Sequence, residues 1–359
     1  MRPDPLPELG FYGLPGHSTS PADLLDECRD GEDIGLGACF LSERFNVKEL
    51  GALSGAACAV TDRLGVATGV TNHNTRHPHV TAAWATTLHR MSGGRFGLGF
   101  GRGFDAMFSA IGLSPVTMAQ LDDMAGLLRR LWHGETILGH DGPAGKYPFL
   151  RLDETFDEDI PLLLAALGPK TMTFGGRVFD GVILHTFFTD NTLAECVERI
   201  RGGAEAAGRD PASVRVWAVL AVLCDLPEAA RMRMLVGRMA TYLQAYGDVL
   251  VSINGWDPQV LTDFRAAPVV QSVRGAIDAV ASPTELEAIA ELIPDEWLAA
   301  SAVGSPEHVA ARIEDQLAAG ADGVILHAST PAQLAPAVAA YRAKRPADRF
   351  AGRSTNPGR

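Results

Sequence analysis

The stretch Leu64-Gly-Val-Ala-Thr-Gly-Val-Thr-Asn-His-Asn-Thr-Arg-His-Pro-His-Val80 decides how the chain folds. Its first half, Leu64 to Val70, is apolar and uncharged, which is typical of a strand buried on both faces of a parallel sheet. Its second half is polar, and Pro78 then opens a helix, because proline is favoured at the first helical position. The stretch therefore predicts a buried strand, a polar loop at its carboxyl end and a returning helix.

The same succession of apolar run, polar loop and helix recurs along the chain. Eight runs read as buried strands: Leu9–Leu14, Gly37–Leu41, Leu64–Val70, Arg95–Gly103, Pro161–Ala166, Asp180–His185, Val214–Leu223 and Asp322–His327. The first six residues of the sixth and eighth runs are identical, Asp-Gly-Val-Ile-Leu-His, as expected for equivalent strands that each end in a histidine at one mouth. We predict the α/β class and a (β/α)8 TIM barrel. A doubly wound sheet, the alternative, usually needs a glycine-rich first turn, which Leu14-Pro-Gly-His17 does not supply.

Two stretches exceed what a barrel of this kind requires. Residues 135–160 carry Gly, Pro and acidic side chains and predict an inserted hairpin. Residues 227–300 predict a helical insertion between strands seven and eight, with breaks at Gly255, Pro258, Pro268 and Pro283. We therefore expect a single barrel domain over residues 1–345, followed by a disordered tail over 346–359.

The composition of the chain limits the classes of molecule that it is expected to bind. The chain has 359 residues, of which 47% are hydrophobic, and a net charge of -12, which argues against nucleic acids and anionic membranes as partners. No apolar run approaches the roughly 20 residues of a membrane-spanning helix. The five cysteines form no CxxC pair, so free thiols in a reducing cytoplasm are expected. The remaining class of partner is a small-molecule substrate.

Two motifs are similar to known functional motifs, but the spacing of one and the position of the other do not fit them. The run Gly97-x-Gly-x-Gly-x-Gly103 fails the GxGxxG spacing of dinucleotide sites at every register, and instead predicts a strand with one glycine face. The pair His77-Pro-His79 is similar to the HxH pair of barrel metallohydrolases, but it follows the third strand rather than the first. We predict no metal site and keep a metal-dependent hydrolase as the least favoured alternative.

Three groups of polar residues are candidates for a site at the carboxyl ends of the strands. Glu43 could accept a hydrogen bond from a ligand, and Arg44 could hold an anion but cannot act as a base; a surface ion pair is the alternative. The loop from Thr71 to His77 offers hydroxyls, amides and imidazoles. The sequence Gly168-Pro-Lys170 opens a helix, where free amides and a lysine favour a phosphate site over an ordinary turn.

In order and spacing, these blocks resemble the luciferase-like monooxygenase family, and in particular its members that use the deazaflavin coenzyme F420. The resemblance rests on four blocks: Leu41-Ser-Glu-Arg-Phe45, Gly69-Val-Thr-Asn72 with Thr75-Arg-His-Pro78, Gly94-Arg-Phe-Gly-Leu-Gly-Phe-Gly-Arg-Gly103, and Ala165-Ala-Leu-Gly-Pro-Lys170. It spans nearly the whole chain and includes Val303-Gly-Ser-Pro-Glu307.

The resemblance implies a barrel with a flavin or deazaflavin at its mouth, and a homodimer. In F420-using relatives a non-prolyl cis peptide ends the third strand, and Gly69–Val70 is the matching position. Thr71 and Asn72 match residues at the edge of the ring, and Gly101 and Gly103 match residues beside it. Gly168, Pro169 and Lys170 match the phosphate site.

The chain departs from the sugar-phosphate dehydrogenases of this family. Their Asp-His pair after the second strand is Glu43-Arg44 here, and their acid after the fourth strand falls on Phe104. This leaves His73 as the nearest obvious proton carrier. We predict a cytoplasmic F420-dependent oxidoreductase that transfers a hydride, with Glu43, Arg44 and His73 as catalytic candidates. The alternative is an FMN-dependent monooxygenase of the same fold.

Overall fold

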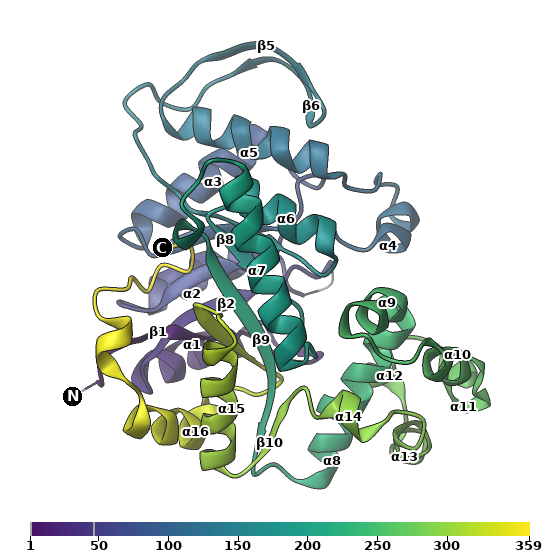
Figure 1. Ribbon diagram of the computed structural model, residues 1–359. Coiled ribbons are helices and arrows are strands. Elements are labelled where there is room, and N and C mark those ends of the chain that lie inside the picture. The colour runs from purple at the N-terminus through teal and green to yellow at the C-terminus, as the bar shows by residue number, and fades with distance from the viewer. Residues whose placement is uncertain (1, 46) are drawn as a thin grey trace.

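The computed structural model describes residues 2–45 and 47–359 as a closed barrel of parallel strands (Figure 1). The strands around the barrel are β9 (Arg215–Cys224), β11 (Gly323–His327), β1 (Leu6–Tyr12), β2 (Leu36–Leu41), β3 (Gly65–Thr68), β4 (Phe96–Phe100), β7 (Leu162–Ala165) and β8 (Gly181–Ile183), and β8 pairs with β9 to close the circle. The predicted α/β class and (β/α)8 barrel are therefore confirmed.

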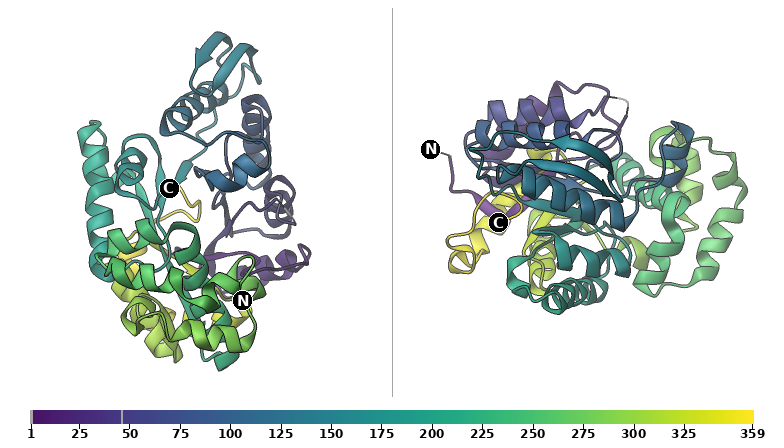
Figure 2. Two further views of the ribbon diagram at one scale, coloured as in Figure 1. Left: turned by 90° about the vertical axis from the view of Figure 1, so that its right-hand side faces the viewer. Right: turned by 90° about the horizontal axis from the view of Figure 1, so that it is seen from above.

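Helices surround the barrel on its outer side (Figure 2). They are α1 (Asp23–Asp33), α2 (Leu50–Val60), α3 (Pro78–Met91), α5 (Met118–Trp132), α6 (Pro169–Val178), α7 (Asp190–Ala206), α15 (Pro306–Ala318) and α16 (Pro331–Lys344). Pro78 is the first residue of α3, as the opening stretch predicts. Short helices lie at Asp105–Ala110 (α4), Pro211–Ser213 and Ala347–Phe350. No helix in the described part of the chain is long and apolar enough to cross a membrane.

Two additions interrupt the barrel. An antiparallel hairpin of β5 (Ile137–Gly142) and β6 (Gly145–Leu150) projects beyond α5 (Figure 1). After β9 the chain forms a helical lobe beside the barrel, drawn in green, which we call the α8–α14 lobe. Its elements are α8 (Glu228–Arg231), a π-helix (Met232–Val236), α9 (Gly237–Asn254), α10 (Pro258–Ala266), α11 (Pro268–Ser272), α12 (Ile277–Val280), α13 (Pro283–Ala290) and α14 (Asp295–Leu298). The chain returns through β10 (Ala302–Gly304), which pairs with the end of β9.

Large side chains from alternate strands fill the barrel interior. Phe40 of β2 and Trp217 of β9 meet edge to face, with ring centroids 4.9 Å apart. Gly10 of β1 makes room for them, since a Cβ there would lie 2.7 Å from the Phe40 ring. The barrel is therefore a packed core with space for ligands only at its ends.

The first strand begins earlier than the sequence predicts. β1 starts at Leu6 rather than Leu9, and therefore includes Glu8, whose side chain is fully buried. The Tyr341 hydroxyl and the Arg345 guanidinium of the last helix both donate to its carboxylate. A charged residue is a poor strand signal from sequence, and its partners lie more than three hundred residues away along the chain.

The predicted disorder of residues 346–359 is wrong. The yellow chain segment turns back to the strands (Figure 2), and its backbone closes the amino-terminal end of the barrel. Arg215 donates from Nη1 to the carbonyls of Ser354 and Asn356, and Trp217 Nε1 donates to Pro357 over 2.7 Å. The sequence gives no apolar pattern here because backbone carbonyls make the contacts. We call residues 353–359 the base plug.

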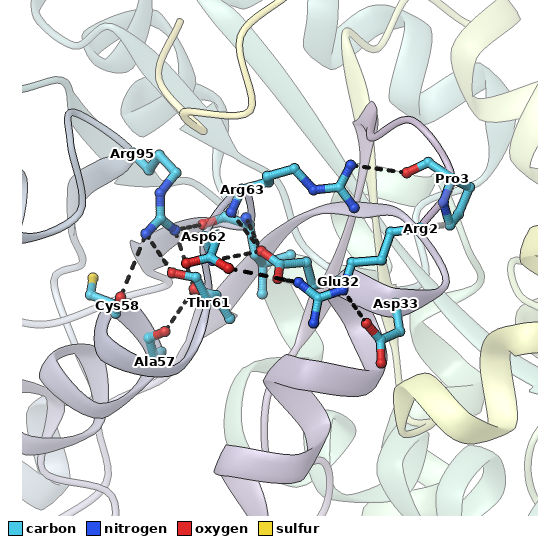
Figure 3. A network of polar contacts seen from close by, with 11 residues as sticks. Arg2, Pro3, Glu32, Asp33, Ala57, Cys58, Thr61, Asp62, Arg63 and Arg95 are labelled. Atoms are coloured by element: carbon cyan, nitrogen blue, oxygen red, sulfur yellow. Dashed lines mark hydrogen bonds and ion pairs between the residues drawn. The ribbon is translucent and has the colours of Figure 1, made fainter.

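Figure 3 shows a polar network that holds the start of β3 at the same end of the barrel. The Glu32 carboxylate of α1 accepts the backbone N–H groups of Asp62, Arg63 and Leu64. Arg2 adds an ion pair. Burial by itself would raise the pKa of Glu32, but these amides and Arg2 hold it below its ordinary value.

Glu32→Ala is expected to lower the free energy of unfolding by about 3 kcal/mol, because it leaves several buried amides without an acceptor. The pKa of Glu32 is depressed in the folded chain, so its contribution is present above the unfolded pKa and is lost as the pH falls through the folded one. Urea melts of wild type and variant between pH 3 and 7 measure both effects. Asp33→Asn on the same helix is the control, since the Asp33 side chain is 53% exposed. Equal melts for the two variants would contradict the assigned role.

Candidate active site

The strands β1, β2, β3, β8 and β11 end around a cavity of about 150 Å3 at the carboxyl mouth of the barrel, and Val219 in the middle of β9 also lines it. Residues from strand ends and from α9 line it, among them Tyr12, Arg44, Lys48, Gly69, His185, Tyr242 and His327. A larger hollow of about 560 Å3 lies between α7, α14 and α15. We assign the site to the mouth, because barrel active sites lie at the carboxyl ends of the strands.

The end of β3 forms the floor of this mouth. The Gly69–Val70 peptide bond is cis, which confirms the prediction for this position. Thr71 then bridges to β4: its N–H donates to the Gly99 carbonyl over 3.0 Å, and its carbonyl accepts from Gly101 N–H over 2.8 Å. Val70 packs over the glycines of β4, where a Cβ on Gly101 would come within 2.5 Å of it. The glycine face of β4 is thus occupied by the chain itself.

Glu43 is held in place by Arg76. Both carboxylate oxygens of Glu43 accept from the Arg76 guanidinium over 2.8 Å, and Thr71 Oγ1 also donates to this carboxylate. Burial would raise the pKa of Glu43, but its bonds to Arg76 and Thr71 bring it below the ordinary value. The Glu43 side chain is only 4% exposed. Its carboxylate therefore positions the loop after β3 and does not line the cavity.

Arg44 and Lys48 bring positive charge to the mouth. Arg44 Nη1 donates to the Gly16 carbonyl, and Lys48 Nζ donates to the Leu14 carbonyl. Burial, followed by the nearby Arg44 charge, lowers the pKa of Lys48 to about 8. Burial and the charge of Arg238 likewise lower the pKa of Arg44. Besides burial, Lys48 is therefore disfavoured as a cation by Arg44 and Arg238, and Arg44 by Arg238.

The α8–α14 lobe supplies the wall opposite β2. Asp278 at α12 lies 2.8 Å from Arg238 Nη2 and 3.0 Å from His17 Nε2, so it bridges the lobe to the loop after β1. Tyr242 and Tyr246 of α9 face His185, with ring centroids 4.7 Å and 5.1 Å away. Tyr246 interrupts the helix with φ -146° and ψ 32°.

His185 and His327 occupy equivalent places at the mouth, as the repeated hexapeptide predicts. Burial lowers the pKa of His185 to about 4, and burial with neighbouring cations holds the pKa of His327 well below its ordinary value. Both imidazoles are thus neutral near pH 7. Nδ1 of His185 lies 3.0 Å from the Thr186 carbonyl, which favours a proton on Nδ1 and leaves Nε2 as an acceptor.

Other residues predicted from the sequence lie around the mouth rather than in the cavity. Asn72 Oδ1 accepts from the backbone and hydroxyl of Thr75 and so shapes the loop after β3. His73 is buried beside Gln120, with burial lowering its pKa, and it does not line the cavity. Gly103 has φ +70°, and a Cβ there would collide with Phe108.

The predicted phosphate residues lie at the start of α6. Gly168 precedes the helix and Pro169 is its first residue, as the sequence predicts. Lys170 is exposed, and Pro169 lines a separate hollow of about 430 Å3 together with Arg199 and Asp248. These residues belong to the same end of the barrel as the cavity but do not line it.

Sequence reasoning missed the residues that the α8–α14 lobe contributes, namely Arg238, Tyr242, Tyr246 and Asp278. They carry no motif, and only the fold brings them to the mouth. Lys48 was missed as well, although it lies four residues after Arg44. In the part of the chain that the structure describes, no three His, Cys, Asp or Glu side chains form a group able to hold a metal ion.

Comparisons with known proteins agree with this geometry. The family model for luciferase-like monooxygenases matches residues 10–323. Among curated proteins, 5,10-methylenetetrahydromethanopterin reductase of Methanolobus tindarius is 26% identical over 82% of this chain and 86% of its own. F420-dependent glucose-6-phosphate dehydrogenase of Nocardia farcinica is 25% identical over 89% and 92%.

Solved structures share the fold. The coenzyme F420-dependent tetrahydromethanopterin reductase of Methanopyrus kandleri superposes with a TM-score of 0.76 at 21% identity, covering 93% of this chain and 97% of its own. A monooxygenase of Streptomyces bottropensis superposes with a TM-score of 0.64 at 20% identity, covering 96% and 100%. The F420-dependent reductase and the monooxygenase therefore share this barrel fold.

Proposed function

Since the chain belongs to the luciferase-like monooxygenase family and is an oxidoreductase of that family, we propose that it is an F420-dependent enzyme. It would transfer a hydride between the deazaflavin and a small organic substrate at the barrel mouth. The observation that carries this proposal is the mouth cavity itself, where Gly69 at the end of β3 faces aromatic and imidazole rings of β8, β11 and α9. Such mixed apolar and polar linings are typical of cofactor sites.

Support for F420 over FMN comes from the curated relatives. Two of them are named F420-dependent glucose-6-phosphate dehydrogenases, each 25% identical to this chain over more than four-fifths of its length. An FMN-dependent monooxygenase is the second candidate, because the matching family model is itself described as luciferase-like monooxygenase. The metal-dependent hydrolase is set aside by membership in this family.

The donor set at the mouth fits a flat ring with polar edges. Gly69 leaves backbone accessible, and Tyr12 and Tyr242 offer hydroxyls and ring faces. The volume is small, since ligand pockets usually enclose about 300–1,000 Å3 and this cavity encloses about 150 Å3. This cavity would therefore take only part of the cofactor.

Chain residues would hold the cofactor and the substrate in the following way. F420, when bound, supplies the carbon that accepts or donates the hydride. The backbone at Gly69–Thr71 would support the ring, and the amides at Gly168–Lys170 would hold its phosphate. His185 Nε2 would accept a hydrogen bond from the substrate hydroxyl, in place of His73, which does not line the cavity.

Titration of the purified chain with F420 and with FMN tests the cofactor. Quenching of its five tryptophans reports binding. We expect at least a hundredfold tighter binding of F420, which corresponds to about 3 kcal/mol. Equal affinity, or a preference for FMN, would end the F420 assignment and favour the monooxygenase.

Lys170→Ala is expected to weaken F420 binding by about 1–3 kcal/mol, the range for losing one charge-assisted contact. The same fluorescence titration measures it. Lys146→Ala on the exposed β5–β6 hairpin is the matched control and should leave the affinity unchanged. An unchanged dissociation constant for Lys170→Ala would place the phosphate elsewhere, for instance at Arg102.

A homodimer and a cytoplasmic location remain part of this proposal. All five cysteines are free and buried, which is compatible with a reducing compartment. Leu138 and Phe149 are neighbours across the β5–β6 hairpin and are 73% and 58% exposed, so they offer apolar surface to a second copy. Light scattering at micromolar concentration determines the mass, and a monomer would remove the dimer from the proposal.

A further inference from the structure

The charged side chains that line the mouth cavity are all cationic. Arg44 enters from the loop after β2, and Lys48 follows four residues later. Among the described residues that line the cavity there is no carboxylate. The remaining polar lining consists of neutral groups, including the imidazoles of His185 and His327.

The carboxylates near the mouth cavity already have partners within the chain. Asp278 is paired with Arg238 and with His17. Glu27 lies behind Lys48 and accepts the Leu14 N–H over 2.6 Å, and burial raises the pKa of Glu27 to about 7. Within the described part of the chain, neither Arg44 nor Lys48 forms an ion pair with a carboxylate, as their bonds go to backbone carbonyls. The positive charges of Arg44 and Lys48 are therefore not fully neutralised by carboxylates of the chain.

We propose that the mouth cavity takes a small anionic substrate, whose carboxylate or phosphate lies between Arg44 and Lys48. This inference rests on the function proposed above and adds the class of substrate to it. A guanidinium binds such groups through two parallel hydrogen bonds, and an ammonium adds a point charge. An anion here would also offset the repulsion from Arg44, which after burial is the next cause of the lowered pKa of Lys48.

The two histidines that line the same cavity indicate what the rest of the substrate carries. His185 and His327 face the same space as neutral imidazoles, which can donate to or accept from a hydroxyl or carbonyl oxygen. The cavity of about 150 Å3 admits a compact molecule. The substrate class is therefore a small acid or phosphate ester that also carries an alcohol or its carbonyl counterpart.

Binding of matched small probes to the full-length chain tests this assignment. Acetate, inorganic phosphate and the neutral acetamide are titrated by ligand-observed NMR, with and without saturating F420. We expect the two anions to bind and acetamide to bind at least tenfold more weakly. Arg44→Gln and Lys48→Met should each weaken anion binding about tenfold, while Arg44→Lys retains part of it. Lys344→Met, an exposed lysine at the end of α16, is the matched control.

The cofactor titrations separate this inference from the function on which it rests. If neither F420 nor FMN binds while the anions still require Arg44, the function fails and the anion site stands. If Arg44→Gln weakens F420 binding as strongly as anion binding, and phosphate competes with F420, the site belongs to the cofactor and the substrate assignment is overturned. Equal binding of acetate and acetamide, or anion binding unchanged in both folded variants, also overturns it.

Discussion

Deletion of the base plug, residues 353–359, is expected to lower the free energy of unfolding by at least about 4 kcal/mol, because it leaves the buried Arg215 guanidinium with only one of its four carbonyl acceptors, that of Pro7. The Arg215 guanidinium donates to carbonyls of Ser354, Asn356 and Arg359, and it is 5% exposed. Burial, with a contribution from Arg353, lowers the pKa of Arg215 to about 9.

A substitution at Arg215 tests whether this guanidinium causes the loss of stability on truncation. If the stranded guanidinium is responsible, Arg215→Met should destabilise the full-length chain but recover stability in the truncated one. Thermal and urea melts of the four chains measure this coupling. Arg353→Gln keeps every plug carbonyl and removes only exposed contacts with the carboxylate and the carbonyl of Asp322, so it should change stability by less than about 1 kcal/mol. A truncated chain as stable as wild type would contradict the role given to the plug.

Arg76→Met is expected to lower stability by about 3–5 kcal/mol, because it leaves the Glu43 carboxylate buried and unpaired. The same change should weaken cofactor binding, since Glu43 and Arg76 together hold Thr71 at the edge of the mouth. Without Arg76, the largest influence that lowers the pKa of Glu43 is lost, and only the hydrogen bonds from Thr71 and the Leu50 backbone oppose the effect of burial. In wild type the Glu43–Arg76 contribution is present above the unfolded pKa of Glu43 and is lost as the pH falls through the lower folded one.

The defect of Arg76→Met should therefore shrink in acid, and melts from pH 3 to 7 measure it. A double-mutant cycle with Glu43→Gln isolates the pair, and the two changes should be far from additive. Glu49→Gln is the control: Glu49 contacts the same guanidinium, but its side chain is 59% exposed, so the change should cost less than about 1 kcal/mol. Additive losses would show that Arg76 acts through another contact.

The sequence predicts most of the barrel because its signals are local. Uncharged apolar runs mark the strands, and Pro78 and Pro169 mark the helices that follow. The repeated hexapeptide predicts that His185 and His327 meet at the mouth, since equivalent strands place equivalent residues alike. Each of these features depends on a few neighbouring residues, so it can be predicted from a single sequence.

The rest of the site depends on contacts between distant segments. Glu43 was predicted to face a ligand, yet Arg76, 33 residues later, takes both carboxylate oxygens. Arg238 and Tyr242 reach the mouth only because the α8–α14 lobe packs against His17 in the loop after β1 and His185 after β8. The base plug was missed for a related reason, since its backbone rather than its side chains binds Arg215. The residues next to these positions in the sequence therefore do not predict such pairings.

The way in which the α8–α14 lobe is attached has a consequence for evolution and engineering. The lobe leaves the barrel at Asp225 and returns through β10, and the Asp225 N–H donates to the Gly304 carbonyl, so both junctions lie on one strand ladder. A lobe joined at neighbouring points can be exchanged as a cassette without reordering the barrel strands. The strand ends would keep Arg44, His185 and His327, while the cassette would bring new residues in place of Arg238, Tyr242 and Tyr246. Chimaeras made at these two junctions offer a route to altered selectivity on an unchanged barrel.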